Sequence, residues 1–194
     1  MARPREFDVD AALERAMQVF WAKGYASTSL DELCAATGLG RSSLYAAFGD
    51  KHGLYLRALD RYEEGSATRI NEALTRPVPV RAAIAGFVER VIDEIVAGPG
   101  RSGCFIGNCA AELARDDREA AARVRRSLER IETAFRDALG RAKARGEIAP
   151  RADVAALARF FTAGVQGLRL VGKANADRAA LADIAAVMLR ALDT

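Results

Sequence analysis

The chain has 194 residues, of which 51% are apolar, and a formal net charge of +3 at pH 7. This length allows one large or two small domains with an ample core. No run of about 18 uncharged apolar residues is present, and the N-terminus lacks the apolar segment of an export signal. Three cysteines, an odd number, cannot complete a disulfide framework. We therefore expect a cytoplasmic protein that does not cross a membrane.

Every clear segment has the spacing of an amphipathic helix, and no period-two alternation is long enough for a strand. The sequence predicts an all-α fold of about nine helices in two blocks. Residues 1–50 would form a DNA-binding head, and residues 51–194 a ligand-binding and dimerisation body. The longer helices are expected at about 8 or 10 to 23, 51–75, 80–97, 104–115, 117–145, 152–173 and 177–192.

The most informative segment is residues 28–54, TSLDELCAATGLGRSSLYAAFGDKHGL. Ser29 and Glu32 have the spacing of a capping box at a helix start. Gly38 stands where a left-handed C-cap is easiest. Leu44 and Phe48, four residues apart, would hold the next helix down and leave small hydroxyls and a tyrosine outside. This arrangement predicts a helix-turn-helix.

The residues that carry a resemblance run from Phe20-x-x-Lys23-Gly24-Tyr25 through Ser42-Ser43-Leu44-Tyr45-x-x-Phe48-x-Asp50-Lys51. This pattern resembles the TetR family of bacterial repressors over roughly the first third of the chain. The resemblance implies a homodimer that places two recognition helices in successive major grooves of a palindromic DNA operator. It also implies that a small-molecule effector bound in the body releases the DNA.

The first turn of the second short helix holds the candidate base-reading residues, Arg41, Ser42 and Ser43. Arg41 could bind a guanine in bidentate fashion or merely contact a phosphate. Ser42 and Ser43 could instead be ordinary capping residues. Ala46 departs from the family pattern, where a larger polar residue is common, so only a methyl contact with thymine is expected there.

Other side chains are expected at the phosphate backbone. Tyr45 has the position that contacts backbone in the family, and Lys51 begins a helix, where amides and charge together favour a phosphate. Thr28 could contribute its hydroxyl. Arg3 and Arg5 could form a minor-groove or phosphate arm, or a disordered tail. Basic and acidic residues balance over residues 1–57, so the position of the charges must carry DNA binding.

Cys104 is the candidate redox sensor. The segment RSGCFIGNCAAE at residues 101–112 resembles a stretch in a subset of TetR-type regulators, some of which sense thiol-reactive compounds. Cys104 would sit at a helix start close to Arg101, and both features favour a thiolate. The alternative is that Cys104 and Cys109 are small buried hydrophobes, and Cys34 is expected to be packing.

The body is expected to hold an effector cavity and a dimer interface. The cavity candidates, which could equally be plain core, are Phe87, Cys104, Phe105, Phe160, Phe161 and Arg169. The last two helices would form a four-helix interface through Leu157, Phe161, Gly164, Val165, Leu168, Leu181, Ile184, Ala185, Met188 and Leu192.

Other classes of function have less support. His52 is the only histidine and is expected to be exposed, so neither a zinc site nor a Ser-His-Asp system is predicted. We expect no metal, no cofactor and no catalysis. Glu112, Asp116 and Asp117 are interpreted as solvated or capping acids. The competing hypotheses are a helical module that sequesters a ligand without binding DNA, and an enzyme with Cys104 as nucleophile.

Overall fold

The computed structural model describes residues 8–193. These residues form nine α-helices and two short 3-10 helices, and no strand occurs among them, as the helical spacing predicts. The bounds are α1 Val9–Lys23, α2 Leu30–Thr37, α3 Arg41–Phe48, α4 Lys51–Leu74, α5 Val80–Ala97, η1 Pro99–Ser102, α6 Phe105–Glu112, α7 Arg118–Ala144, α8 Val154–Ala174, α9 Arg178–Arg190 and η2 Ala191–Asp193.

Side-chain caps explain where most of these helices begin. The predicted capping box is confirmed, since Ser29 and Glu32 each accept a backbone amide of the other. Aspartates precede α1, α4, α7, α8 and α9, and each carboxylate accepts amides of the first turn. Gly38 ends α2 with φ 73°, the left-handed conformation that favours glycine.

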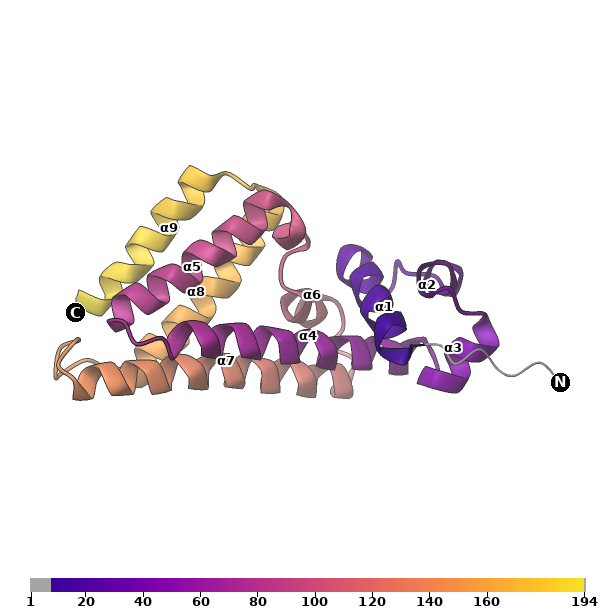
Figure 1. Ribbon diagram of the computed structural model, residues 1–194, viewed down its shortest axis with the longest axis horizontal. Helices are drawn as coiled ribbons and strands as arrows, with labels where there is room; N and C mark the ends of the chain where they lie inside the picture. The colour runs from indigo at the N-terminus through magenta and orange to yellow at the C-terminus, as the bar shows by residue number, and fades with distance from the viewer. Residues whose placement is uncertain (1–7, 194) are drawn as a thin grey trace.

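The helices form an elongated molecule (Figure 1). α4 and α7 lie side by side along its length, with α1, α2 and α3 at one end. α5, α8 and α9 pack over the other end, where the C-terminus lies. The short α6 lies between the head and this body, packed on α4 and α7. A displacement of α6 is therefore felt on both sides.

Two hydrophobic cores divide the molecule. One joins α5, α8 and α9 to the C-terminal halves of α4 and α7. The other unites the head with the first half of α4, with α6, and with the start of α7. Phe105 of α6 packs its ring against Tyr55 and Tyr62 of α4 in that second core. α6 is thus anchored in the same apolar cluster as α1, α2 and α3.

The residues expected at the dimer interface on α8 and α9 mostly face the interior of their own subunit. The buried ones are Leu157, Phe161, Val165, Leu168, Leu181, Ala185, Met188 and Leu192. Only Gly164 and Ile184 are partly exposed. The apolar side chains that α8 and α9 leave exposed are Phe160, Leu170, Val171 and Val187.

α8 is also, among the described residues, the one helix whose length and apolar composition would allow it to span a membrane. Of the most apolar 18-residue stretch of this helix, 39% is buried inside the protein. It packs against α5, α7 and α9, as a core helix does.

Candidate nucleic-acid interface and effector site

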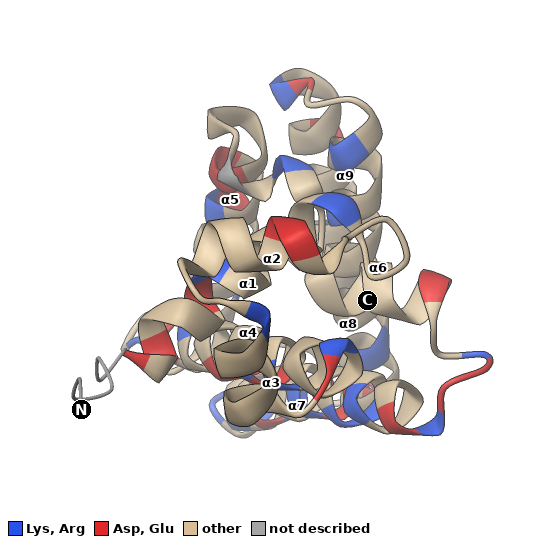
Figure 2. Ribbon diagram, turned by 90° about the vertical axis from the view of Figure 1, so that its right-hand side faces the viewer, with Lys and Arg blue, Asp and Glu red and all other residues tan. Residues whose placement is uncertain are grey.

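The helix-turn-helix presents the outer face of α3 to solvent. Leu44 and Phe48 are buried on the inner face, as predicted. Arg41, Ser42, Tyr45 and Ala46 are exposed, and Ser43 is partly exposed. Figure 2 views the head end-on and shows α3 with little charge, because Arg41 is its one charged residue. The candidate base-reading residues therefore share an accessible surface.

Arg41 is not free in this surface. Its guanidinium nitrogen lies 2.6 Å from a carboxylate oxygen of Asp31, in the first turn of α2. This carboxylate raises the pKa of Arg41 above its ordinary value. The pair is exposed, so it contributes little to stability and can be exchanged for a DNA contact.

Two of the expected phosphate ligands have unexpected surroundings. The Lys51 amine lies 4.4 Å above the ring of Tyr25, at the start of α4. Thr28 is only 1% exposed, and its hydroxyl donates to the carbonyl of Gly24 at 2.6 Å. The expectation that the Thr28 hydroxyl binds phosphate is therefore wrong. Arg3 and Arg5 lie outside the described residues.

The α6 segment is tied to the head by contacts that the sequence reading missed. The indole nitrogen of Trp21 donates to the carbonyl of Gly103 at 3.0 Å. The Glu112 carboxylate accepts the amides of Tyr25 and Ala26, at 2.9 and 2.7 Å. Glu112 is exposed, as expected of a solvated acid, but it also binds these two amides. The first bond joins the segment before the start of α6 to α1, and the other two join the end of α6 to the segment between α1 and α2.

A third tie links the start of α4 to the start of α7. His52 is partly buried rather than exposed, and its ring nitrogen lies 2.6 Å from Asp117. Asp117 also caps α7, as predicted. The amide of Ala120, and then the His52 contact, lower the pKa of this carboxyl. The position of Asp117 directly before α7 predicts its capping role. Its second partner, His52, lies 65 residues away and could not be identified from a local pattern.

A small enclosed cavity of about 30 Å³ lies between α4, α5, α6, α7 and α8. Phe87, Cys104 and Arg169 line it, as expected. The other cavity candidates do not. Phe105 packs against tyrosines of the second core, Phe161 stacks on Phe135, and Phe160 is exposed.

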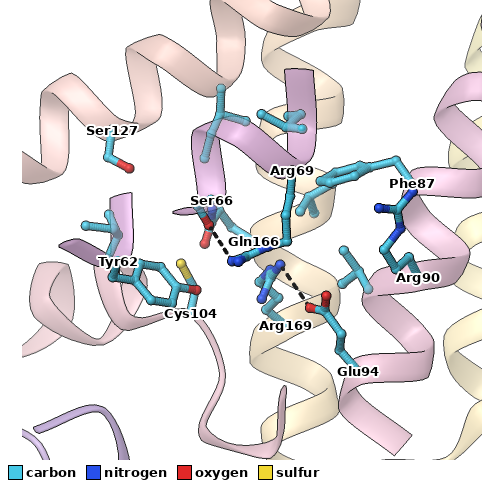
Figure 3. Close-up of a pocket in the computed structure, with 15 residues that line it drawn as sticks. Tyr62, Ser66, Arg69, Phe87, Arg90, Glu94, Cys104, Ser127, Gln166 and Arg169 are labelled. Carbon is cyan, nitrogen blue, oxygen red and sulfur yellow. Dashed lines mark hydrogen bonds and ion pairs between the residues drawn. The ribbon is translucent and has the colours of Figure 1, made fainter. Parts of the chain in front are cut away.

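Figure 3 shows Tyr62, Cys104 and Arg169 around this cavity. The Tyr62 hydroxyl is buried without a hydrogen-bond partner among the described residues. Burial, and then the neighbouring Cys104, raise the pKa of Tyr62. Burial lowers the pKa of Arg169, but Tyr62, Cys104 and Glu94 raise it further, so the guanidinium stays charged. Arg169, not the exposed Arg101, is the cation that interacts with the Cys104 thiol.

The three cysteines are free thiols, with Cys104 and Cys109 buried and Cys34 partly buried. Burial is the main cause that raises the pKa of Cys109. No group of three metal-ligating side chains occurs within residues 8–193. The chemistry that this region offers is therefore thiol chemistry and the binding of a small ligand beside a buried cation.

The two blocks of the chain match two family models. Residues 12–58 match the family described as bacterial regulatory proteins of the tetR family. Residues 81–188 match the tetracyclin repressor-like C-terminal domain. Between them the matches cover both the head and the body.

Similar proteins share this organisation over their full lengths. An uncharacterised HTH-type transcriptional regulator of Bacillus subtilis, YezE, is 35% identical over 194 residues, covering 100% of each chain. The repressor ComR of Escherichia coli is 34% identical, over 97% of this chain and 90% of ComR. The TetR family regulator CifR, in a cysteine mutant bound to operator DNA, superposes with a TM-score of 0.86 at 30% identity. That match covers 98% of this chain and 100% of CifR. The chain therefore belongs to the TetR family of bacterial transcriptional regulators.

Proposed function

We propose that this regulator is a homodimeric repressor that binds a palindromic DNA operator. The accessible outer face of α3 carries this proposal, because Arg41, Ser42 and Tyr45 can all reach a DNA groove from it. The similarity to ComR, a repressor, and to operator-bound CifR supports the same function.

We further propose that a small effector, or modification of Cys104, releases the DNA. Cys104 directly precedes α6, and Gly103, just before this helix, and Glu112, at its end, bond to the head. Cys104 is only 8% exposed and packs in the same core as the head, so a group added to its thiol would disturb the packing of α6 against its neighbours. Displacement of α6 would reorient the head and spoil the spacing of the two recognition helices.

The DNA-binding proposal is tested by fluorescence anisotropy of the reduced protein on the DNA upstream of its own gene. Titrations at two salt concentrations, against a scrambled duplex, should show sequence-selective binding that weakens with salt. If that duplex does not bind, selection from a random DNA library should yield a palindromic site. A library without any selected sequence would contradict the proposal.

The sensor proposal needs the selected operator and a thiol-alkylating reagent. Alkylation should release the operator from wild type but not from Cys104→Ser. Cys34→Ser is the matched control and should respond like wild type, because Cys34 packs within the head. Equal release from wild type and Cys104→Ser would reject Cys104 as the sensor.

A further inference from the structure

A recess of about 410 Å³ opens between α6 and α8, and it shares Cys104, Gln166 and Arg169 with the small cavity. Gly103, Gly107 and Gly167 form part of its wall. Two cationic side chains, Arg169 and Lys173, line it, and none of its lining residues is an acid. Its size suits a small organic ligand, and its charge suits an anion.

Arg169 is a largely buried cation with one ion-pair partner. Its side chain is 9% exposed, and its counter-ion is Glu94, at 3.7 Å. Residues 8–193 supply no hydrogen bond to its guanidinium, which has five N–H donors. An anion in the recess would supply the hydrogen bonds that this guanidinium lacks.

The start of α6 adds a second attraction for negative charge. Cys104 precedes this helix and provides no side-chain cap for its first amides. These amides, with the helix dipole, favour an anion at this end. Gly107 and Gln166 face each other in the wall of the recess, and a Cβ on Gly107 would lie 3.4 Å from the Gln166 side-chain oxygen.

The charge available matches a single carboxylate. Arg169 and Lys173 carry one positive charge each, and the Glu94 carboxylate offsets one of them. Lys173 keeps its charge, because the Asn108 side-chain oxygen to which it donates at 3.1 Å is neutral. About one positive charge is left for a ligand. The planar fork of a guanidinium fits a carboxylate through two parallel hydrogen bonds.

We propose that the recess between α6 and α8 binds a small monocarboxylate through Arg169, with Lys173 at the mouth. The inference rests on the proposed effector role of this region and names the chemical class of its ligand. Binding would draw the Arg169 guanidinium from Glu94 and change the surroundings of Cys104 and Tyr62. Since α6 is tied to the head, this connects ligand binding to the DNA-binding helices.

Calorimetric titration of the full-length protein without DNA tests this directly. Benzoate and hexanoate are the probes, and benzamide and hexanamide are their neutral counterparts. The acids should bind and the amides should not. Arg169→Gln should weaken acid binding by at least about tenfold, the usual loss of a charge-assisted pair. Lys173→Gln should weaken it by a smaller factor.

Glu94→Gln provides the variant that a purely structural role would not explain. It removes the competing carboxylate, so it should tighten acid binding severalfold. Arg125→Gln, an exposed arginine of α7, should bind like wild type. If Arg169→Gln does not fold, Glu94→Gln and Lys173→Gln decide the outcome.

Equal binding of acids and amides, or no binding of either acid, would overturn the proposal. So would unchanged affinities in Glu94→Gln and Lys173→Gln. DNA release is measured separately, by anisotropy on the selected operator. A protein that fails to bind DNA but still binds the acids would refute the repressor role and leave the carboxylate site standing.

Discussion

In the free protein Arg41 has an ion-pair partner that a base contact would replace. Its guanidinium is held by Asp31 in the free protein, and a guanine would have to replace that carboxylate. Arg41→Ala should relax the preference at one base pair, with a loss of about 1–3 kcal/mol of discrimination. Asp31→Asn should strengthen DNA binding, since it frees the guanidinium and removes a negative charge.

Substitutions at residues expected to contact the DNA phosphates should change affinity without changing base preference, and they serve as the control. Tyr45→Phe and Lys51→Ala should weaken binding to all duplexes alike, and Lys51→Ala should also reduce the salt dependence. Anisotropy with single-base operator variants separates the two patterns. An unchanged base preference in Arg41→Ala would remove Arg41 from the base-reading role.

Glu32 makes the start of α2 sensitive to acid. The hydrogen bond from Lys23, and then those from Ser29, lower the pKa of this carboxyl from 4.5 to about 2. A carboxyl whose pKa is lower in the folded than in the unfolded protein stabilises the fold at pH values above its unfolded pKa. That stabilisation is lost as the pH falls through the folded pKa. The contribution of Glu32 should therefore be lost between about pH 4.5 and pH 2.

Urea unfolding over this range checks the effect. Glu32→Gln should be less stable than wild type at pH 6, and the two should converge towards pH 2. Glu129→Gln, which changes another exposed acid, should show no comparable convergence. Parallel pH profiles for wild type and Glu32→Gln would contradict the assigned cause.

At the scale of elements, α6 is held against the head through a glycine that permits close approach. Gly24 has φ 87°, and a Cβ on it would lie 2.8 Å from a Glu112 carboxylate oxygen. Glu112→Ala should cost about 1 kcal/mol of stability, reduced by its exposure. Gly24→Ala should cost about 1–2 kcal/mol more stability than Glu112→Ala, because alanine is strained at a positive φ.

Hydrogen exchange locates this effect better than global stability does. The amides of Tyr25 and Ala26 are bonded to Glu112 and should exchange faster in both variants. Asp116→Asn, which changes an exposed acid four residues further on, should leave these amides protected. Unchanged exchange in Glu112→Ala would show that this contact does not hold the head.

The same elements show what the sequence could and could not predict. Capping boxes, aspartate caps and the glycine turn are local, so the helices and the helix-turn-helix followed from spacing alone. The bond between Glu112 and Tyr25 joins residues 87 apart, and no local pattern identifies such a partner. α8 has apolar side chains on two faces, so its periodicity could not decide whether Phe161 or Phe160 faces the core.

For the whole molecule, the exposed apolar side chains of α8 and α9 bear on the proposed homodimer. Leu170 is 71% exposed and Val187 is 57% exposed, whereas the stripe first expected at the interface lies inside the subunit. An apolar face of this kind suits a two-fold interface, where each residue of the face occurs twice. We therefore expect Leu170 and Val187 to lie between two subunits.

Leu170→Glu should dissociate the proposed homodimer, because it places two like charges in one apolar contact. Sedimentation equilibrium should then give a monomer of 20.8 kDa. Operator affinity should fall by about 10²-fold or more, since each head would bind its half-site alone. Val96→Glu introduces the same charge at an exposed apolar position of α5 and should leave both properties unchanged. A Leu170→Glu protein that remains dimeric would place the interface elsewhere, and the geometry of two linked heads would have to be derived from another face.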